Sequence, residues 1–326
     1  RGMGTRGRER GAPPAAGEGP HYDEFDFDAL ERDLQLAMKH GVFHPLHIVA
    51  MCTDRRASER ALEYLKGKGQ LTRESWRETC NVGDSVLHLA CKYGNRAVVK
   101  AVLANVDVSE HADVILQTNG QGTSPLTQSC MSRNVEVLEL LLDALPEGFL
   151  SGKRLRDACK SRYVPHYLAV DEKGTPNVLK MLLARFPTDY IVMKSSSGFT
   201  PLSRAGNLGN SDSVRLMLSY LSEDIADHRE EMVSVMCACC IPATLDVFRV
   251  FLDKLSPAVA ASRRHQGSTV LHFAALHQSA ELIQLVLERL PRSLRYVAND
   301  SGMTPEDMAV GKVKLLFQPA VKAACV

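Results

Sequence analysis

The sequence predicts an all-α protein, an α-solenoid of stacked helix pairs, and three observations lead to that prediction. A short motif recurs along the chain at intervals of 34 to 41 residues. An apolar helical stripe follows the copies of this motif at a similar distance. Only 6% of the 326 residues are aromatic although 45% are hydrophobic, so we expect a core of leucine, valine and alanine. One helix pair cannot bury its own apolar face, and repeated pairs are therefore expected to stack.

The charge balance argues against two classes of partner. The chain has 39 lysines and arginines against 38 acidic residues, a net charge of +1. This charge gives no broad attraction for nucleic acid or for an anionic membrane. The longest uncharged stretch in the apolar part, Met232 to Leu245, has 14 residues and contains Pro242. A membrane helix needs about 20 apolar residues. We therefore expect no nucleic-acid partner and no membrane insertion.

The cysteines favour a reducing compartment. There are nine, an odd number, and most lie inside apolar segments. With no recognisable secretory signal peptide, this pattern predicts free thiols and a cytoplasmic location. The first residue is arginine rather than methionine, which leaves room for further chain upstream.

The N-terminal residues are expected to form a tail and a capping helix. Residues 1–20 are mostly Gly, Pro, Ala and Arg, a composition with too little apolar surface to offset the entropy of ordering, so we predict a disordered tail. An amphipathic capping helix is expected within residues 21–38. Asp26 or Asp28 can serve as its N-cap, and Gly41 follows its C-terminal end.

The recurring motif is a Ser, Thr or His followed by Pro or Val and, in the clear copies, by Leu. Its second position falls at Pro45, Val86, Pro125, Pro165, Pro201, Val235, Val270 and Pro305. The copies at Pro165 and Val235 are found through the apolar stripe that lies 12 to 17 residues further on. The spacings of 41, 39, 40, 36, 34, 35 and 35 residues predict eight repeats. The predicted repeats cover residues 39–79, 80–118, 119–158, 159–194, 195–228, 229–263, 264–298 and 299–326.

Each repeat is expected to fold in the same way. A turn with a glycine free to adopt positive φ comes first, and Ser or Thr then caps a short helix that has Pro in its first turn. A break such as Gly94 reverses the chain into a second helix, which ends near a proline such as Pro146. We place the extra length of the early repeats in linkers such as residues 106–116, which are expected to lengthen the turns. The short second helix of the last repeat, residues 313–317, is expected to cap the array.

This arrangement resembles the ankyrin repeat family, whose unit is a β-turn followed by two antiparallel helices with a T-P-L-H-x-A motif. The resemblance covers residues 39–326. It is clearest in the second, fifth and seventh repeats and weakest in the fourth and sixth. It implies turn or hairpin fingers beside the helices and a non-catalytic function in binding other proteins.

Three histidines stand at one position of the motif: His47, His88 and His272. One histidine per repeat suggests catalysis at first sight. A side chain that recurs at a fixed offset instead indicates a role in the geometry of the repeat. We predict that each histidine forms a hydrogen bond that ties the turn to the start of the helix.

Cys237, Cys239 and Cys240 give the strongest chemical motif, because a C-x-x-C spacing can bind zinc or carry redox chemistry. A closed tetrahedral site needs two further ligands, and the sequence offers no second C-x-x-C and no histidine pair at ligand spacing. The repeat register places these cysteines in the first helix, where we expect them to pack as small apolar side chains. A metal or redox function remains the alternative.

Other catalytic patterns are weaker. Asp171 and Glu172 form an acid pair, but no His, Ser or Lys partner can be placed beside them, so we expect a solvated loop. No phosphate-binding loop and no nucleophile elbow is present. An enzyme that uses Cys91 or Cys237 is the weakest alternative. We therefore predict no catalytic residue, no metal and no cofactor.

The resemblance implies that partners bind along a concave face formed by turn tips and exposed ends of the first helices. The corresponding residues are Asn81, Asp84, Lys92, Tyr93, Gln121, Thr123, Met131, Tyr163, Asp171, Phe199, Asn207, Leu208, Leu276 and His277. This set mixes aromatic, apolar and oppositely charged side chains, which suits a protein partner. Tyr93, Tyr163 and Phe199 are the expected anchors, because aromatic residues often dominate interface energy.

These observations predict a monomeric protein that serves as a scaffold for an unidentified protein partner. The alternative is that the chain is the targeting or substrate-recruiting portion of a larger enzyme or effector. In that case the catalytic part lies outside this chain.

Overall fold

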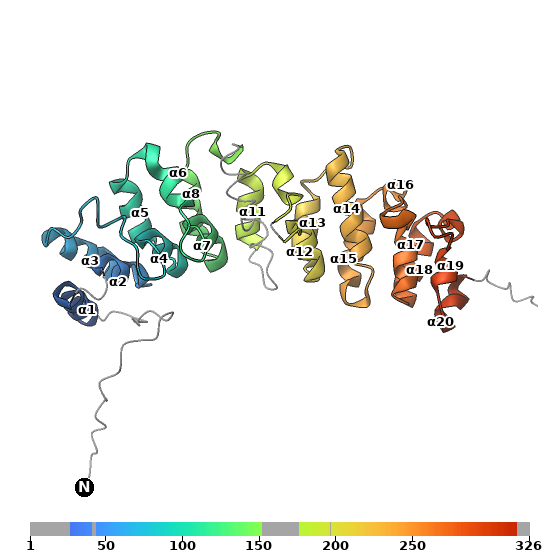
Figure 1. Cartoon of the computed structure of the whole chain (residues 1–326), viewed down its shortest axis with the longest axis horizontal. Coiled ribbons are helices and arrows are strands. Elements are labelled where there is room, and N and C mark those ends of the chain that lie inside the picture. The colour runs from blue at the N-terminus through green and yellow to red at the C-terminus, as the bar shows by residue number, and fades with distance from the viewer. Residues whose placement is uncertain (1–26, 41–43, 152–175, 196, 318–326) are drawn as a thin grey trace, which may run out of the picture. The chain divides into compact units, whose positions relative to one another are not determined.

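A computed structural model describes residues 27–40, 44–151, 176–195 and 197–317 (Figure 1). Within these ranges the regular elements are helices, and the β-structure is limited to one isolated bridge between Thr79 and Ser85. The all-α solenoid class is confirmed. The chain divides into two compact parts, residues 1–146 and residues 147–326, each of which is described by itself. None of the helices in the described ranges is long and apolar enough to cross a membrane.

The N-terminal part contains α1 and three helix pairs. In each pair we call the helix that comes first along the chain the first helix and its partner the second helix. The bounds are α1 Phe27–His40, α2 Pro45–Met51, α3 Arg55–Gly67, α4 Val86–Tyr93, α5 Arg96–Asn105, α7 Pro125–Ser132 and α8 Val135–Asp143. The first helices α2, α4 and α7 pack side by side in one row, and α3, α5 and α8 pack in a second row. α1 covers the beginning of both rows by packing on α2 and α3.

The C-terminal part continues with α11 and four further pairs. The bounds are α11 Pro176–Arg185, α12 Pro201–Asn207, α13 Ser211–Leu218, α14 Ala226–Ala238, α15 Leu245–Lys254, α16 Pro257–Ala260, α17 Val270–Leu276, α18 Ala280–Arg289, α19 Pro305–Met308 and α20 Gly311–Lys314. A 3-10 turn, Leu315–Phe317, extends α20, which matches the short last helix expected near residues 313–317. The first helix expected after Pro165 lies outside the described residues.

The predicted Ser and Thr caps are present at the starts of first helices. The Ser85 hydroxyl accepts the backbone N–H of His88 at the start of α4. The same side-chain bond caps α7, α12 and α19 through Ser124, Thr200 and Thr304. Proline occupies the first turn of these last three helices, where its missing N–H costs no intrahelical bond. The sequence therefore sets these helix starts locally.

A closed turn, which we call a finger, precedes several of the first helices. The N–H of Cys80 donates to the carbonyl of Asp84 at 2.9 Å, and the Gly83 between them has a φ of 80°. The same bond between residues four apart closes the fingers at 119–123, 195–199, 264–268 and 299–303. Neighbouring fingers also bond, because the Gly120 N–H donates to the Val82 carbonyl at 3.1 Å. A Cβ on Gly83 would lie 2.8 Å from the Gly120 nitrogen, so this close approach requires glycine as well.

The linker at residues 106–116 does not lengthen a finger, and that prediction is wrong. It forms a 3-10 turn, Val108–Glu110, and a further helix, α6 His111–Leu116. The His111 ring nitrogens lie 2.9 Å from the Leu103 carbonyl oxygen and 3.1 Å from that of Ala144. The added residues thus satisfy carbonyls near the ends of two second helices, α5 and α8, a nonlocal arrangement that composition does not reveal.

The helix start predicted at Ser234 and Val235 is also wrong. α14 begins at Ala226 and runs for 13 residues, so Val235 lies in its interior. Its N-cap residue, Ile225, makes no side-chain cap bond. No Pro or Gly interrupts the segment, which is rich in residues that tolerate or favour a helix, and the helix therefore continues upstream of the motif position.

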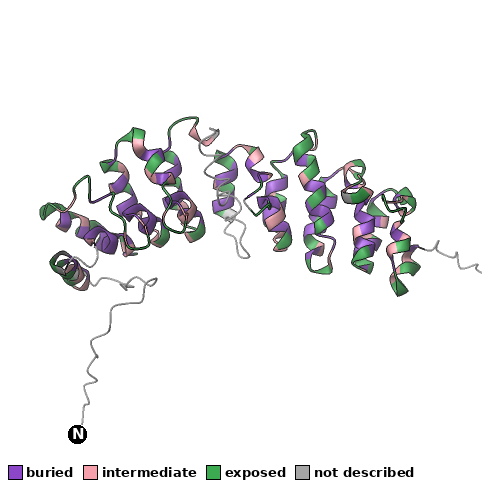
Figure 2. Cartoon of the chain, viewed as in Figure 1, coloured by how far each residue is buried: buried purple, intermediate pink, exposed green. Residues whose placement is uncertain are grey.

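The core lies between the two rows of helices (Figure 2). It is dominated by leucine, valine and alanine, as predicted, with a few aromatic side chains such as Phe248 and Phe251. Buried and exposed residues alternate along the helices, and most of the described charged residues are exposed or partly buried (Figure 2). Fully burying one leucine or valine contributes about 1.5–3 kcal/mol, so the seams between pairs are the main source of stability.

Candidate functional site

Two of the motif histidines, His88 and His272, connect a finger to its helix and to the next finger. His88 Nδ1 accepts the backbone N–H of Ser85 at 3.2 Å. The opposite ring nitrogen, Nε2, therefore carries the proton and donates to the Thr123 carbonyl at 3.0 Å. Burial lowers the pKa of His88 below its ordinary value. Protonation of Nδ1 would also break its bond to Ser85, and the neutral imidazole is the form that fits.

His272 repeats this arrangement in the C-terminal part. Its Nδ1 accepts the Thr269 N–H at 3.0 Å, and its Nε2 lies 3.1 Å from the Met303 carbonyl oxygen. The Nε2 of His47 lies 3.3 Å from the Asp84 carbonyl oxygen. The predicted bond to the start of the helix is confirmed for His88 and His272, whereas the Nδ1 of His47 is buried without a hydrogen-bond partner. The histidines additionally link successive repeats, which the motif alone did not reveal.

The three clustered cysteines are buried between helices. Burial raises the pKa of Cys237 and Cys239 to about 12, and that of Cys240 also lies well above its ordinary value. The thiols are therefore neutral at physiological pH, and a neutral thiol is a poor nucleophile and a poor metal ligand. Cys240, two residues past the end of α14, has its Sγ 3.5 Å from the Met236 carbonyl oxygen of that helix. In the described ranges, no group of three or more His, Cys, Asp or Glu side chains is placed to hold a metal ion.

The predicted binding residues of the N-terminal part divide into two groups. Asn81, Lys92, Gln121 and Met131 are exposed. The other three, Asp84, Tyr93 and Thr123, are partly buried. The Asp84 carboxylate accepts the Asn119 side-chain N–H at 2.6 Å, and the Thr123 carbonyl accepts from His88. Asp84 and Thr123 therefore build the fingers, while the first group supplies exposed side chains.

In the C-terminal part the predicted residues are more exposed. Phe199 is 46% exposed at a finger, and Leu276 is 54% exposed at the end of α17. Asn207 and His277 are also exposed, while Leu208 is partly buried. The remaining predicted residues, Tyr163 and Asp171, lie outside the described residues, as does Glu172.

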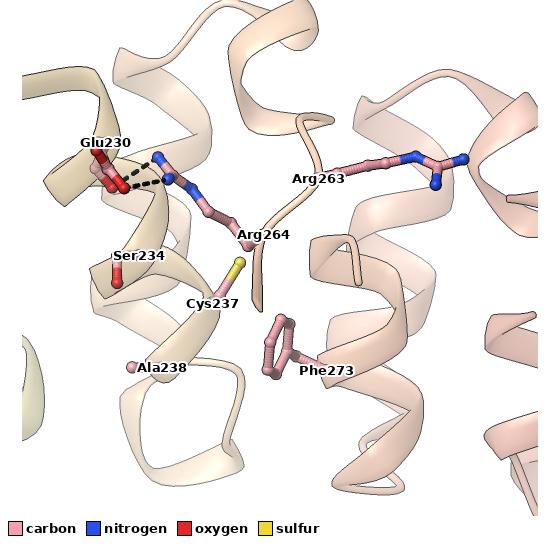
Figure 3. A pocket seen from close by; sticks show the side chains of 7 residues that line it. All are labelled: Glu230, Ser234, Cys237, Ala238, Arg263, Arg264 and Phe273. Atoms are coloured by element: carbon pink, nitrogen blue, oxygen red, sulfur yellow. Dashed lines mark hydrogen bonds and ion pairs between the residues drawn. The ribbon is translucent and has the colours of Figure 1, made fainter. Parts of the chain in front are cut away.

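A pocket that the sequence did not predict lies between α14 and α17 (Figure 3). Its volume is about 590 Å³. Its lining residues are Glu230, Ser234, Cys237, Ala238, Arg263, Arg264 and Phe273. The pocket was missed because the sequence placed the start of the helix at Ser234, whereas four of these residues form one face of the longer α14.

The two arginines that line the pocket differ in their ion pairing and direction. Arg264 Nη1 lies 3.1 Å from the Glu230 carboxylate, and its Nη2 donates to the Glu230 carbonyl at 2.8 Å. Arg264 Nε is buried and has no hydrogen-bond partner. Arg263 is exposed and points to the opposite side of the connecting segment (Figure 3). Within the described part of the chain, no ion pair involves Arg263.

Comparison with known proteins gives a family match in the N-terminal part. The sequence model of the family described as ankyrin repeats (3 copies) matches residues 46–150. That segment contains the pairs α2–α3, α4–α5 and α7–α8. No curated protein matches the sequence.

Two solved structures are similar to the chain. The ankyrin repeat domain of Bcl-3, a member of the IkappaB protein family, is 18% identical with a TM-score of 0.49, and the match covers 83% of this chain and 96% of that one. The human ASB11 ankyrin repeat domain is 21% identical with a TM-score of 0.43, covering 84% of this chain and 96% of that one.

The fingers and helix pairs of the matched segment recur further along the chain. Past residue 150, fingers closed by the same bond precede α12, α17 and α19, and each of these helices pairs with a following helix. Two further features of the matched segment recur there. α12 and α19 start at capped Thr residues, and His272 bonds to the start of its helix as His88 does. Residues 46–150 of the chain therefore match ankyrin repeats, and the helix pairs past residue 150 have the same geometry.

Proposed function

We propose that this chain is a non-catalytic scaffold that binds a partner protein along a concave face made of fingers and exposed ends of first helices. Ankyrin repeats are in general protein–protein interaction modules. One observation carries the proposal: hydrogen bonds between neighbouring fingers fix the backbone, while side chains at the tips stay exposed. The Gly120 N–H bonds to the Val82 carbonyl, yet the Val82 side chain is 48% exposed.

Such a surface has a physical advantage in binding. A backbone that is already ordered loses little conformational entropy when a partner docks. Affinity can then come from a few anchors in contact with the partner. Three large apolar side chains at the predicted positions, Met131, Phe199 and Leu276, are between 46% and 54% exposed. We propose a cytoplasmic location, because the described cysteines are free thiols. We also propose that the protein is a monomer.

The test is capture of a partner by the full chain, followed by titration of the purified partner against variants. Phe199→Ala should weaken binding by about tenfold, as expected for an aromatic anchor. Tyr93→Ala should also weaken it. Neither variant should change the thermal midpoint by more than a few degrees, because Phe199 is exposed and Tyr93 partly so.

The matched control is Tyr296→Ala. Tyr296 is 75% exposed but lies in the 3-10 helix Arg292–Tyr296, which is not part of a finger. This variant should bind like the wild type. Equal loss in Tyr296→Ala and Phe199→Ala, or no loss in Phe199→Ala and Tyr93→Ala, would show that the finger surface is not the binding site.

A further inference from the structure

We propose that one edge of the C-terminal part binds an amphipathic helix of the partner protein, whose apolar side lies on the edge and whose lysines or arginines lie along one flank. The edge consists of the ends of the first helices and the turns that lead into the second helices. We call it the turn edge, and it contains residues 207–210, 238–244, 276–279 and 308–310. This inference rests on the proposed scaffold function and names the kind of segment that the scaffold binds.

The turn edge lacks acidic, lysine and arginine side chains. Its four segments contain no Asp, Glu, Lys or Arg, although these residues make up 24% of the chain. In the N-terminal part, by contrast, the turn between α2 and α3 contains Asp54 and the turn between α7 and α8 contains Arg133. A charged group placed on the turn edge would lose its water without gaining an ionic partner there. The edge therefore favours an uncharged contact surface.

Apolar side chains are exposed along this edge. Leu276 is 54% exposed at the end of α17, and Val310 is 64% exposed just before α20. Ala238, at the end of α14, is also exposed, as are Pro242 and Ala243 in the turn that follows. Exposed apolar residues that are grouped together are typical of an interaction surface.

Contacts between neighbouring turns keep the edge ordered. The Gln278 side chain donates to the Met308 carbonyl at 3.1 Å and accepts the Val310 N–H at 3.0 Å, so the last two turns adjoin. A Cβ on Gly209 would lie 3.7 Å from the Ala243 carbonyl oxygen, so the first two turns adjoin as well. Because these turns are held before a partner binds, docking costs little conformational entropy.

The spacing of the turns favours a helix over an extended segment. Neighbouring helices pack with their axes about 8–10 Å apart, so apolar side chains of successive turns recur at about that interval. Seven residues of an α-helix rise about 10.5 Å and return to nearly the same side of the helix. Three residues of an extended strand span about 10 Å, but the side chain then points to the opposite face. A helix with apolar residues seven apart therefore matches the edge.

A row of acidic side chains lies beside the edge. Three second helices begin with an exposed acid in the first turn, directly after the uncharged turn: Asp212 in α13, Asp246 in α15 and Glu281 in α18. α20 has Lys312 in its first turn, so the acidic row covers three of the four pairs. Complementary charge favours a partner helix with basic residues on the flank that faces this row.

Binding can be measured with immobilised libraries of helix-forming peptides about 22 residues long, built mainly from Ala and Gln. In the main library, positions seven apart are drawn from Leu, Ile, Met and Phe, and the residue three positions after each is Lys. One control library has Glu at those flanking positions. A second control places the apolar residues five apart, so that they point to different sides of the helix. The purified full chain should retain each control about tenfold less than the main library.

Variants of the edge and of the acidic row have matched controls. Leu276→Glu and Val310→Glu each add a charge to the edge, and Tyr296→Glu makes the same kind of change at an exposed position outside it. The two edge variants should retain the main library about tenfold less than the wild type, and the control should retain it equally. Glu281→Lys reverses a charge of the acidic row, and Glu288→Lys does so two turns further along α18. Only the first should lower the preference for Lys over Glu, by about threefold.

Four results would overturn the proposal: equal retention of the main library and either control by the wild type, unchanged retention by both edge variants, self-association of the full chain that Leu276→Glu abolishes, or binding to phosphatidylcholine vesicles that Leu276→Glu abolishes. The last two would assign the edge to a second copy or to a lipid surface. The outcome is separable from that of the scaffold proposal. If the captured partner is lost with Phe199→Ala but kept with Leu276→Glu and Val310→Glu, the scaffold function stands and the assignment of the turn edge is wrong.

Discussion

The α4–α5 and α14–α15 pairs differ in how their first helices begin and in how close the next pair lies. α4 has 8 residues, starts at the Ser85 and His88 capping box, and ends at Gly94 with a φ of 72°. α14 has 13 residues, no side-chain cap and Cys239 in place of glycine at its end. α4 packs closely on α7, whereas α14 leaves a pocket beside α17. The recurring motif thus sets both the helix start and the close seam. Where the motif is lost, at α14, the seam leaves a pocket.

The largest expected effect is at the cap of the second helix of the regular pair. The side-chain amide of Asn95 is buried and donates to the Val49 and Cys52 carbonyls and to the Ser58 hydroxyl, while its oxygen accepts from Val98. Asn95→Ala leaves these groups unsatisfied and should destabilise the chain by about 2–4 kcal/mol. A chemical denaturation curve measures this.

The corresponding cap in the α14–α15 pair provides the comparison. Thr244, which precedes α15, makes no cap bond to the helix, and its hydroxyl donates only to carbonyls, that of Cys239 at 2.8 Å and that of Ile241 at 3.2 Å. Thr244→Ala should therefore cost about 1 kcal/mol. If Thr244→Ala lowers the free energy of unfolding as much as Asn95→Ala does, the two residues contribute equally to the stability of their helix pairs, and the expected difference is wrong.

The next effect concerns the tight side of α14. Gly206→Ala places a Cβ 2.8 Å from Val235 Cγ1 and 2.9 Å from Cys239 Sγ. Both neighbours are side-chain atoms that can shift somewhat, so we expect a destabilisation of about 1–3 kcal/mol in thermal or urea unfolding. Gly67→Ala is the control, since no atom lies within 4 Å of its Cβ position. An alanine at the end of α3 should be neutral or stabilising by up to about 1 kcal/mol. Equal stability of the two variants would contradict a tight α12–α14 seam.

The buried histidines should make the stability of the folded chain depend on pH. Burial keeps the pKa values of His88 and His272 below the ordinary 6.5. Below about pH 6.5 the unfolded chain therefore binds protons that the folded chain does not, and stability falls as the pH falls. Above that pH the contribution of the histidines is fully present. The urea midpoint should drop between pH 7.5 and pH 5.5, and the double variant His88→Gln with His272→Gln should show a smaller drop.

Glu231, in α14, should change the pH dependence of stability in the direction opposite to the histidines. Burial raises its pKa above the ordinary value of 4.5, and it accepts a bond from the Thr200 hydroxyl. The folded chain holds this proton longer than the unfolded chain, so this contribution weakens as the pH rises above 4.5. Glu231→Gln should therefore steepen the loss of stability on acidification. A flatter profile in this variant would contradict the burial of the carboxylate.

The smallest effect is expected for ion pairs between second helices. Arg96 and Glu136 lie 3.0 Å apart in the N-terminal part, and Arg289 and Asp253 lie 3.3 Å apart in the C-terminal part. All four side chains are at least 40% exposed. Arg96→Ala and Arg289→Ala should each change stability by less than about 1 kcal/mol, with a further reduction in high salt. A large effect of either variant would mean that surface charge, rather than caps and seams, distinguishes the regions.

Local chemistry allowed most of the helix pairs to be predicted. A Ser or Thr before Pro fixes a helix start through bonds within a few residues, and a glycine fixes a turn through its own φ, so these features can be read from the sequence. Phe199 and Leu276 were predicted as exposed binding residues because their repeat positions fix their side. The pocket could not be predicted, since its lining comes from three segments and depends on the spacing of two helices.

The sequence by itself determined the all-α repeat architecture, the capped starts at residues such as Ser85 and the structural role of the motif histidines. These depend on contacts within one repeat, or on an offset that recurs in several copies. Only the tertiary structure decided that residues 106–116 form a helix rather than a long finger, and that α14 starts at Ala226. It also decided which histidine meets which carbonyl and where a seam stays open. The physical reason is that these features depend on packing between neighbouring pairs, and packing distances are set by side chains that lie far apart in the chain.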